Sequence, residues 1–287
     1  MTAAAAKNSQ KKLQGFKREV WTYYRAHKRD MPWRRDMSPY AIIVSEIMLQ
    51  QTQVPRVVPK FDSWMKRFPD WRTLAKTPTR NVLKEWSGLG YNRRALYLKR
   101  IAEEITDNGK RSETLPSDYQ GLIQLPGIGP NTAGAILAYA FNVPHPFIET
   151  NIRSAYIHYF FTEKKGGTKI PDAMIMPLIE ETLADPKIRA NPREWHWALM
   201  DYGSHLKASL PNPSRRSAHH VRQKPFKGSN RELRSEILKS VLRKPARIRD
   251  IESLLKARYP STEIRRNLIA LTREGFIAKK NDIYQIA

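Results

Sequence analysis

The stretch that decides the fold is LPGIGPNTAGAI, residues 125–136. Its Pro-Gly-x-Gly core ends one helix, and a run of small residues begins another, so we predict two helices joined by a hairpin. The backbone N–H groups of Gly127, Ile128 and Gly129, and of the next helix's first turn at Thr132, have no partners inside a helix. We expect them to bind a phosphate. The alternative is a helical corner whose glycines serve only the tight turn.

Helical periods of apolar residues alternate with short Pro/Gly breaks on both sides of this hairpin. The alternation that marks a half-buried strand is scarce there. We therefore predict an all-α domain of many short helices over residues 16–205, preceded by a disordered tail over residues 1–15. Residues 206–230 are rich in Lys, Arg and Pro and contain no Asp or Glu, so we predict a basic linker.

A second region of helical periodicity covers residues 231–287. It predicts three helices, a stop at Gly275 and two short strands around a tight turn, which is the order of a winged-helix domain. The predicted fold class is therefore all-α with a small C-terminal winged-helix (α+β) domain. The third of these helices carries Arg265 and Arg266 on or beside its exposed face. These arginines either contact a polyanion or form only a solvated face.

The composition points to a polyanionic partner. The chain has 287 residues, a formal net charge of +24 and a pI near 10.3, which favours nucleic acid over an anionic membrane. It contains no long apolar run and no signal-peptide pattern, so we expect an intracellular protein, cytoplasmic or nucleoid-associated, with no membrane partner. The chain has no cysteine, which excludes a disulfide framework and a thiol nucleophile. No metal site is expected from the scattered histidines.

Residues 38–54, SPYAIIVSEIMLQQTQV, place one carboxylate, Glu46, in an otherwise apolar helical run. Ile42, Ile43 and Leu49 share its face because helix positions three and four apart are neighbours. A carboxylate on such a face loses hydration, so its pKa rises and it can hold a proton near neutral pH. The alternative is a glutamate whose head reaches solvent or a helix N-terminus.

These segments resemble the endonuclease III / MutY superfamily of DNA glycosylases. LPGIGPNTAGAILAYAF looks like the helix-hairpin-helix of that superfamily. Three further segments follow the MutY-type adenine glycosylase pattern in order and spacing: MPWRRDMSPYAIIVSEIMLQQTQVPRVVPKF, FPDWRTLAKTPTRNVLKEWSGLGYNRRALYL and FIETNIRSAYIHYFF. The resemblance covers roughly residues 16–205 and implies a helix-hairpin-helix glycosylase domain there.

The resemblance also implies catalytic residues. Glu46 occupies the position of the general acid/base that protonates the leaving base. Glu149 stands where the superfamily has an aspartate, and an ionised acid there faces an oxocarbenium-like sugar; its extra methylene is a departure, and a structural helix cap is the alternative. Asn131 occupies the position of the lysine that forms a Schiff base in glycosylase/lyases. Water activated by Glu46 is therefore the expected nucleophile, and AP lyase activity is not expected.

Two further features of the family bear on DNA. By resemblance, Gln51 and the GLGYN loop around Tyr91 fill the gap that a flipped base leaves in the duplex. Asn92 replaces the second tyrosine usual in this loop, so the reading of the opposite base is expected to differ. MutY enzymes proper read 8-oxoguanine with a Nudix-like domain, and residues 231–287 are too few for one.

The superfamily's iron–sulfur ligands are missing. At the spacings of the four cysteines that hold a [4Fe–4S] cluster, this chain has Lys207, Ser214, Ser217 and Gln223. We therefore expect no cofactor. The cationic side chains of this segment, including Arg215 and Arg216, are expected to contact DNA phosphates directly in place of the cluster loop.

Together, the residues and the resemblance predict a monofunctional DNA glycosylase of base excision repair. It would hydrolyse the N-glycosidic bond of a flipped base, with mismatched adenine as the first expectation and mismatched thymine or uracil, or a damaged pyrimidine, as alternatives. A catalytically weak, structure-specific DNA-binding protein is the alternative of another class. The expected partner is double-stranded DNA with a mismatch or lesion, and the expected state is a monomer.

Overall fold

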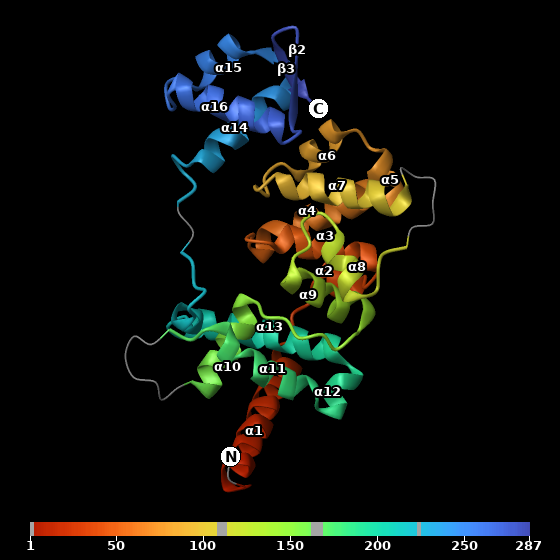
Figure 1. Ribbon diagram of the computed structural model, residues 1–287, viewed down its shortest axis with the longest axis vertical. Coiled ribbons are helices and arrows are strands. Elements are labelled where there is room, and N and C mark those ends of the chain that lie inside the picture. Colours follow the sequence, from red (N-terminus) through yellow and green to blue (C-terminus); the bar gives the residue numbers. More distant parts are fainter. Residues whose placement is uncertain (1–2, 108–113, 162–168, 223–224) are drawn as a thin grey trace. The chain divides into compact units, whose positions relative to one another are not determined.

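A computed structural model describes residues 3–107, 114–161, 169–222 and 225–287 (Figure 1). It is helical apart from a small three-stranded sheet near the C-terminus. The chain divides into two compact units, and the first consists of Met1–Glu46 with Leu115–Val221. The second unit consists of Ile47–Thr114 with Arg222–Ala287. The predicted fold class, all-α with a small C-terminal α+β module, is confirmed.

The first unit is a helical layer around one aromatic core. Its elements are α1 (Ala3–His27), α2 (Pro32–Arg35), most of α3 (Pro39–Leu49), α8 (Tyr119–Gln124), α9 (Pro130–Phe141), α10 (Thr150–Phe160), η1 (Asp172–Met174), α11 (Met176–Leu183), α12 (Pro186–Ala190), α13 (Pro192–Ser209) and η2 (Pro213–Arg216). Phe16 on α1 meets Trp195 on α13 edge to face, with ring centroids 6.0 Å apart, and both side chains are fully buried. This packing fixes α1 and α13 beside α10, the helix that follows Glu149.

The N-terminal helix begins earlier than the predicted end of the disordered tail. Helix α1 starts at Ala3, whereas a disordered tail was predicted over residues 1–15, of which 1 and 2 lie outside the described residues. Leu13 is only 5% exposed and precedes Phe16 and Val20 at helical spacing. The apolar stripe of α1 therefore starts within the predicted tail, and burial of Leu13 stabilises the helix there.

The second unit begins with the end of α3 and continues with short helices around tryptophans. Its first elements are α4 (Val54–Arg67), α5 (Trp71–Lys76), α6 (Thr79–Trp86) and α7 (Arg93–Thr106). Trp64 and Trp86 pack edge to face with ring centroids 5.5 Å apart, and both are fully buried. This core sets the ends of α3 and α6 from which two loops, residues 50–53 and 87–92, emerge.

The C-terminal module has the predicted three helices and two strands. It consists of α14 (Asn230–Arg243), β1 (Ala246–Arg247), α15 (Ile248–Leu255), α16 (Ser261–Arg273), β2 (Ile277–Lys280) and β3 (Ile283–Ile286). The sheet is antiparallel with the order β1-β3-β2, and the β2–β3 turn has positive φ at Asn281 and Asp282, as a two-residue hairpin requires. The two-residue strand β1 was not predicted, because so short a segment has no alternation to detect.

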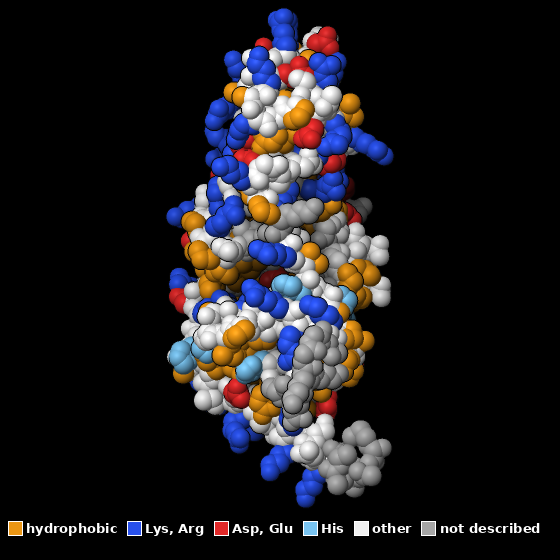
Figure 2. Space-filling view, turned by 90° about the vertical axis from the view of Figure 1, so that its left-hand side faces the viewer, with side chains coloured by type: hydrophobic (Ala, Val, Ile, Leu, Met, Phe, Trp, Pro, Cys, Tyr) orange, Lys and Arg blue, Asp and Glu red, His pale blue; other side chains and the backbone are white. Residues whose placement is uncertain are grey.

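The surface is strongly basic, in keeping with the net charge of +24 (Figure 2). Lys and Arg side chains are spread over the face shown, while Asp and Glu side chains form smaller, separate groups. Across the described residues, every helix is too short or too polar to cross a membrane.

Candidate active site

The predicted hairpin joins α8 and α9. Gly127 has a φ of 77°, a left-handed conformation that favours glycine. The N–H of Ile128 donates to the carbonyl of Leu125 at 3.1 Å, so the expectation that this N–H is available to a phosphate is wrong, because the turn itself uses it. Gly129 is the N-cap of α9 and provides no side-chain cap. Its φ is −97°, and an added Cβ would meet nothing within 4 Å, so neither backbone nor space inside the protein requires glycine there. Space for at least a methyl group is therefore left beside Gly129, at the start of α9.

Glu46 lies on α3 among buried apolar neighbours. Its side chain is half-buried, whereas Ile42 and Ile43 are almost completely buried. Burial raises the pKa of Glu46 well above its usual range, and the negative charge of Glu149 raises this pKa further. The predicted reason for an acid on this face, a retained proton, therefore agrees with its surroundings.

Glu149 is the N-cap residue of α10, but its side chain makes no capping hydrogen bond. The structural-cap alternative therefore has no support from the contacts. Burial raises the pKa of Glu149, while the positive charge of Arg153 lowers it. Arg153 itself forms a two-pronged ion pair with Asp172, with N···O distances of 2.7 and 2.6 Å. A carboxylate at a helix N-terminus is also favoured by the helix dipole, so the surroundings support the ionised form of Glu149 more than that of Glu46.

Asn131 fixes the segment that leads into Glu149. Its Oδ1 accepts a hydrogen bond from the N–H of Ile148 at 3.2 Å. On the same helix, Gly134 allows a close approach, because an added Cβ would lie 2.7 Å from the Cβ of Phe147. Helix α9 thus positions the Glu149 segment through one hydrogen bond and one close contact, and Asn131 acts as a tether.

Tyr139 is a site residue that the sequence did not single out. Burial raises its pKa well above the ordinary range, and the charges of Glu46 and Glu149 raise it further. The phenol is therefore neutral and lies within the electrostatic reach of both carboxylates. Tyr139 stacks on Trp197 with ring centroids 6.0 Å apart. The available signal was a single polar aromatic residue in the run AGAILAYAF, which otherwise reads as core.

Within the second unit, Gln51 and Tyr91 lie on two separate loops with strained backbones. Their φ angles are 55° and 46°, in the left-handed region that non-glycine residues rarely adopt. Backbone strain of this kind is concentrated at functional sites. Asn92, the departure from the usual tyrosine, is the N-cap residue of α7 and makes no side-chain cap.

A buried arginine joins these two loops. The Nη1 of Arg94 donates to the carbonyls of Ile47, Met48 and Gln50 at 2.8, 2.9 and 2.6 Å. Its Nη2 donates to the carbonyl of Gly90 at 3.0 Å and also reaches Thr52 and Leu89. Burial lowers the pKa of Arg94 to about 10, which leaves it charged near neutral pH. Local sequence patterns do not reveal this role, because an arginine beside an exposed loop is normally a surface residue.

The segment without cysteines is held by packing and backbone hydrogen bonds. Ser214 and Ser217, at two of the cluster positions, are each 2% exposed. The N–H of Ile170 donates to the carbonyl of Arg216 at 2.8 Å, and the N–H of Ala218 donates to the carbonyl of Ile170 at 2.9 Å. Helix α13 extends through Lys207 into the predicted linker, and Gln223 lies outside the described residues.

The predicted DNA-contacting arginines differ in how far they are engaged. Arg215 is exposed, whereas Arg216 is half-buried and donates to the carbonyl of Phe161 at 2.6 Å. Arg265 forms an ion pair with Glu252 at 2.6 Å. Arg266 borders a hollow that α16 shares with α7. Arg215, Arg265 and Arg266 are therefore exposed, and Arg216 is the one of these four cations that is partly buried.

The comparisons with known proteins agree with this geometry. Residues 44–178 match the family described as "HhH-GPD superfamily base excision DNA repair protein". The chain is 35% identical to an adenine DNA glycosylase of Buchnera aphidicola over 182 residues, which are 63% of this chain and 50% of that protein. It is 40% identical to the adenine DNA glycosylase of Mycolicibacterium smegmatis over 136 residues, which are 47% of this chain and 46% of that protein.

A solved structure of a thermostable thymine-DNA glycosylase is also similar. It has a TM-score of 0.56 and 25% identity, and the match covers 70% of this chain and 90% of that one. The chain spans about half the length of the curated relatives it matches. Residues 44–178 are therefore similar to the HhH-GPD superfamily of base excision DNA repair proteins.

Proposed function

We propose that this protein is a monofunctional DNA glycosylase that hydrolyses the N-glycosidic bond of a base flipped out of double-stranded DNA. The observation that carries the proposal is the pair Glu46 and Glu149, two carboxylates within reach of each other's charge in surroundings that raise the pKa of each. Two acids whose surroundings favour different protonation states can divide the roles of proton donor and charge stabiliser.

In the proposed reaction, protonated Glu46 gives its proton to the departing base as the bond to C1′ of the sugar breaks and its electron pair leaves with the base. Ionised Glu149 faces the positive charge that develops on the sugar. Glu46, now ionised, takes a proton from the water that adds to C1′. The products are a free base and an abasic site.

The tether role of Asn131 supports a reaction without strand cleavage. A carboxamide cannot attack C1′ and form a Schiff base, which needs an amine. Its Oδ1 is already engaged by the N–H of Ile148. We therefore propose hydrolysis by water and no AP lyase step at this position.

The first proposed substrate is mismatched adenine. Support comes from the curated relatives, which are named adenine DNA glycosylases at 35% and 40% identity. Thymine in a mismatch is the second candidate, because the similar thymine-DNA glycosylase structure is matched over 90% of its length. Asn92 adds weight to this alternative, since it departs from the tyrosine usual in MutY-type loops.

The proposed enzyme works without an iron–sulfur cluster. The residues present do not fit that group, because the chain has no cysteine and the cluster positions carry Lys207, Ser214, Ser217 and Gln223. We further propose that Arg215, Arg216 and Arg222 of this segment contact DNA phosphates. Alanine at all three should reduce DNA affinity and flatten its salt dependence, and an unchanged salt slope would remove the segment from the interface.

We also propose the oligomeric state, partner and location of this protein. We take it to act as a monomer on double-stranded DNA that contains a mismatch or lesion, in the cytoplasm or at the nucleoid. Sedimentation of the protein alone and with a short duplex measures this stoichiometry.

The deciding experiment is a panel of duplexes, each with one mismatch or lesion, incubated with the protein and separated before and after alkali. Strand cleavage only after alkali supports a monofunctional glycosylase, and the responding duplex identifies the base. Cleavage without alkali contradicts the assignment of Asn131. If no duplex is cleaved under either condition, a structure-specific DNA-binding protein becomes the better description.

A further inference from the structure

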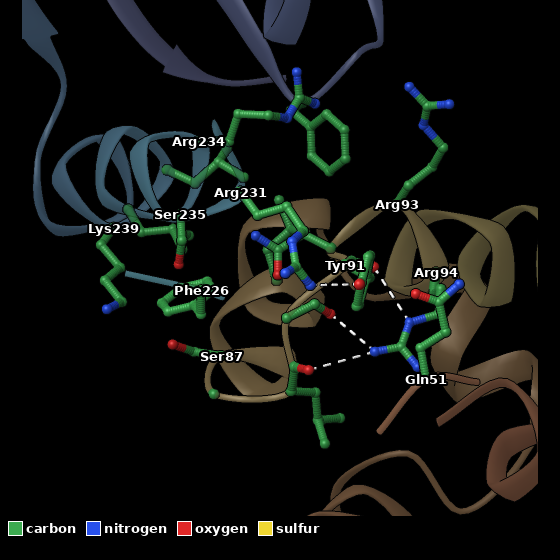
Figure 3. A pocket seen from close by; sticks show the side chains of 18 of the residues that line it. Gln51, Ser87, Tyr91, Arg93, Arg94, Phe226, Arg231, Arg234, Ser235 and Lys239 are labelled. Atoms are coloured by element: carbon green, nitrogen blue, oxygen red, sulfur yellow. Dashed lines mark hydrogen bonds between the residues drawn. The ribbon is translucent and has the colours of Figure 1, made fainter. Parts of the chain in front are cut away.

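The second unit contains a cleft of about 810 Å³ that the proposed chemistry does not use (Figure 3). One wall is formed by the loops that carry Gln51 and Tyr91. The other is formed by α14, with Arg231 and Lys239, and by the preceding Phe226. The C-terminal module and the two strained loops therefore share one concave surface, with a volume in the roughly 300–1,000 Å³ range of small-ligand sites.

The lining has the chemistry of a nucleotide site. Its described residues include six cations: Arg56, Arg93, Arg94, Arg231, Arg234 and Lys239. Two glutamates outside the lining pair with three of them, Glu236 with Lys239 at 2.9 Å and Glu274 with Arg93 and Arg234. Phe226 is 52% exposed and offers a flat apolar face. The amides of Gln51 and Asn92 provide both donors and acceptors beside it. Aromatic faces for a base, cations for a phosphate and amides for the base edge are the groups that bind unpaired nucleotides.

Arg231 ties the two walls together. Its guanidinium lies over the ring of Tyr91 at 5.2 Å, and its Nη1 donates to the Tyr91 hydroxyl. Arg94 lies 5.5 Å from the same ring, so two guanidinium groups hold Tyr91 in place. A cation in the first turn of a helix is disfavoured by the helix dipole, and Arg231 occupies the first turn of α14. Its contact with Tyr91 and an anionic ligand in the cleft would offset that disadvantage.

The usual recognition helix of a winged helix is not the element that faces this cleft. Helix α16 borders a different hollow, lined by Arg266 and Ile269 together with Tyr97 of α7. Glu274, just after α16, pairs with Arg93 of α7 at 2.7 Å and with Arg234 of α14 at 2.6 Å. These contacts turn α14 rather than α16 toward the loops.

We propose that the cleft binds one unpaired nucleotide of DNA, with its base against Phe226 and the guanidinium of Arg231 and its phosphate on Lys239 and Arg56. The identity of this nucleotide rests on the proposed function: it is the one left without a partner when the substrate base is flipped out. Helix α14 is then part of the DNA-binding surface, and Arg231 contributes to the selection of the opposite base.

Equilibrium binding to two duplexes tests this site without any base release. Both contain a tetrahydrofuran abasic analogue, which faces a normal nucleotide in one duplex and a second abasic analogue in the other. The intact protein should bind the first duplex about tenfold more tightly, which is the scale of one base stacked on an aromatic or guanidinium face. Arg231→Ala should lose this preference. Arg249→Ala, an exposed α15 variant with the same change in charge, should keep it.

Phe226→Ala provides an independent test, because removal of an exposed side chain leaves the fold intact. It should lose the preference for the duplex with a normal nucleotide while the salt dependence of binding stays unchanged. The proposal is overturned if Arg231→Ala or Phe226→Ala retains the tenfold preference, or if Arg249→Ala loses it equally. Since neither duplex contains a base to be released from the abasic position, a failure of the glycosylase proposal would leave this result interpretable.

Discussion

The two units that carry the predicted site residues differ in how their buried charged groups are compensated. In the first unit, Glu46 and Glu149 lie within electrostatic reach of each other, and burial raises the pKa of both. In the second unit, the guanidinium of Arg94 is also buried, yet it is surrounded by carbonyl groups that accept its hydrogen bonds. The ionised forms of the two carboxylates are destabilised by burial, which is typical of reactive groups. The charge of Arg94 is compensated by its hydrogen bonds, so this residue stabilises the fold.

Glu46→Gln should have the largest effect on the carboxylate pair, through the rate of base release. An amide of the same shape cannot donate a proton to the base, so the single-turnover rate of base release should fall about 1,000-fold. Duplex affinity should remain within about twofold, because no phosphate contact is lost. Glu181→Gln, an exposed change in the same unit, is the control. An unchanged rate in Glu46→Gln would reject the assigned role.

Arg94→Ala should have the largest effect on the stability of the second unit. Several buried carbonyls would lose their donor together, so the free energy of unfolding should fall by about 3 kcal/mol, measured by urea denaturation. Arg56→Ala is the control, because Arg56 is exposed and donates to the carbonyl of Gly88. Its loss should stay under about 0.5 kcal/mol. Similar losses in the two variants would show that the contacts of Arg94 are not stabilising.

Glu149 distinguishes charge from shape within the carboxylate pair. Glu149→Gln should slow base release about 100-fold, because a neutral amide does not stabilise a cationic sugar. Glu149→Asp keeps the charge and moves it by about one ångström, so we expect a smaller loss. The measurement is the single-turnover rate at saturating protein. If Gln were tolerated better than Asp, position rather than charge would be the function of Glu149.

The raised pKa of Glu46 also predicts a pH-dependent stability. A folded-state pKa above the unfolded value means that the folded state binds the proton more tightly, so stability falls as pH rises through the raised pKa. Gln cannot ionise, so Glu46→Gln should be more stable than the parent by on the order of 1 kcal/mol at about pH 8 and equally stable at about pH 4. Urea midpoints at both pH values measure this. A gain at the acidic pH alone would reverse the sign and contradict the assignment.

The smallest expected effects are those of substitutions at the two hairpin glycines. Gly127→Ala should lower the free energy of unfolding by about 1–2 kcal/mol, because its φ of 77° is strained for alanine. Gly129→Ala should leave stability unchanged, since its added Cβ meets nothing within 4 Å, yet weaken duplex binding severalfold by obstructing a phosphate. Thermal melting and fluorescence anisotropy separate the two effects. Unaltered DNA affinity in Gly129→Ala would favour the tight-turn alternative for the hairpin.

Much of the fold could be predicted from local patterns. The hairpin at Gly127 and the three C-terminal helices appear where Pro/Gly breaks and helical periods placed them, because turn chemistry and apolar spacing act over a few residues. The start of α1 was misjudged because Leu13 stands alone among polar residues, and only its tertiary burial shows that the stripe includes it.

The candidate site was predicted less evenly. Glu46 was visible as an acid in an apolar run, but Tyr139 and Arg94 were not, because the first resembles core and the second resembles surface. Their roles depend on long-range contacts: Tyr139 with the two carboxylates and Arg94 with the carbonyls of residues 47–50. Such contacts have no period in the sequence. The orientation of Arg266 toward α7 likewise follows from docking of the module, which local patterns do not encode.

The hydrogen bond between Asn131 and Ile148 limits how this chain could acquire a new reaction. A single change of Asn131 to lysine would supply the amine that lyase chemistry needs, but it would also remove the acceptor that holds the backbone ahead of Glu149. The same substitution would therefore add a nucleophile at residue 131 and misplace the catalytic acid Glu149. A route from hydrolysis to strand cleavage would therefore need a second, compensating substitution before or together with the first.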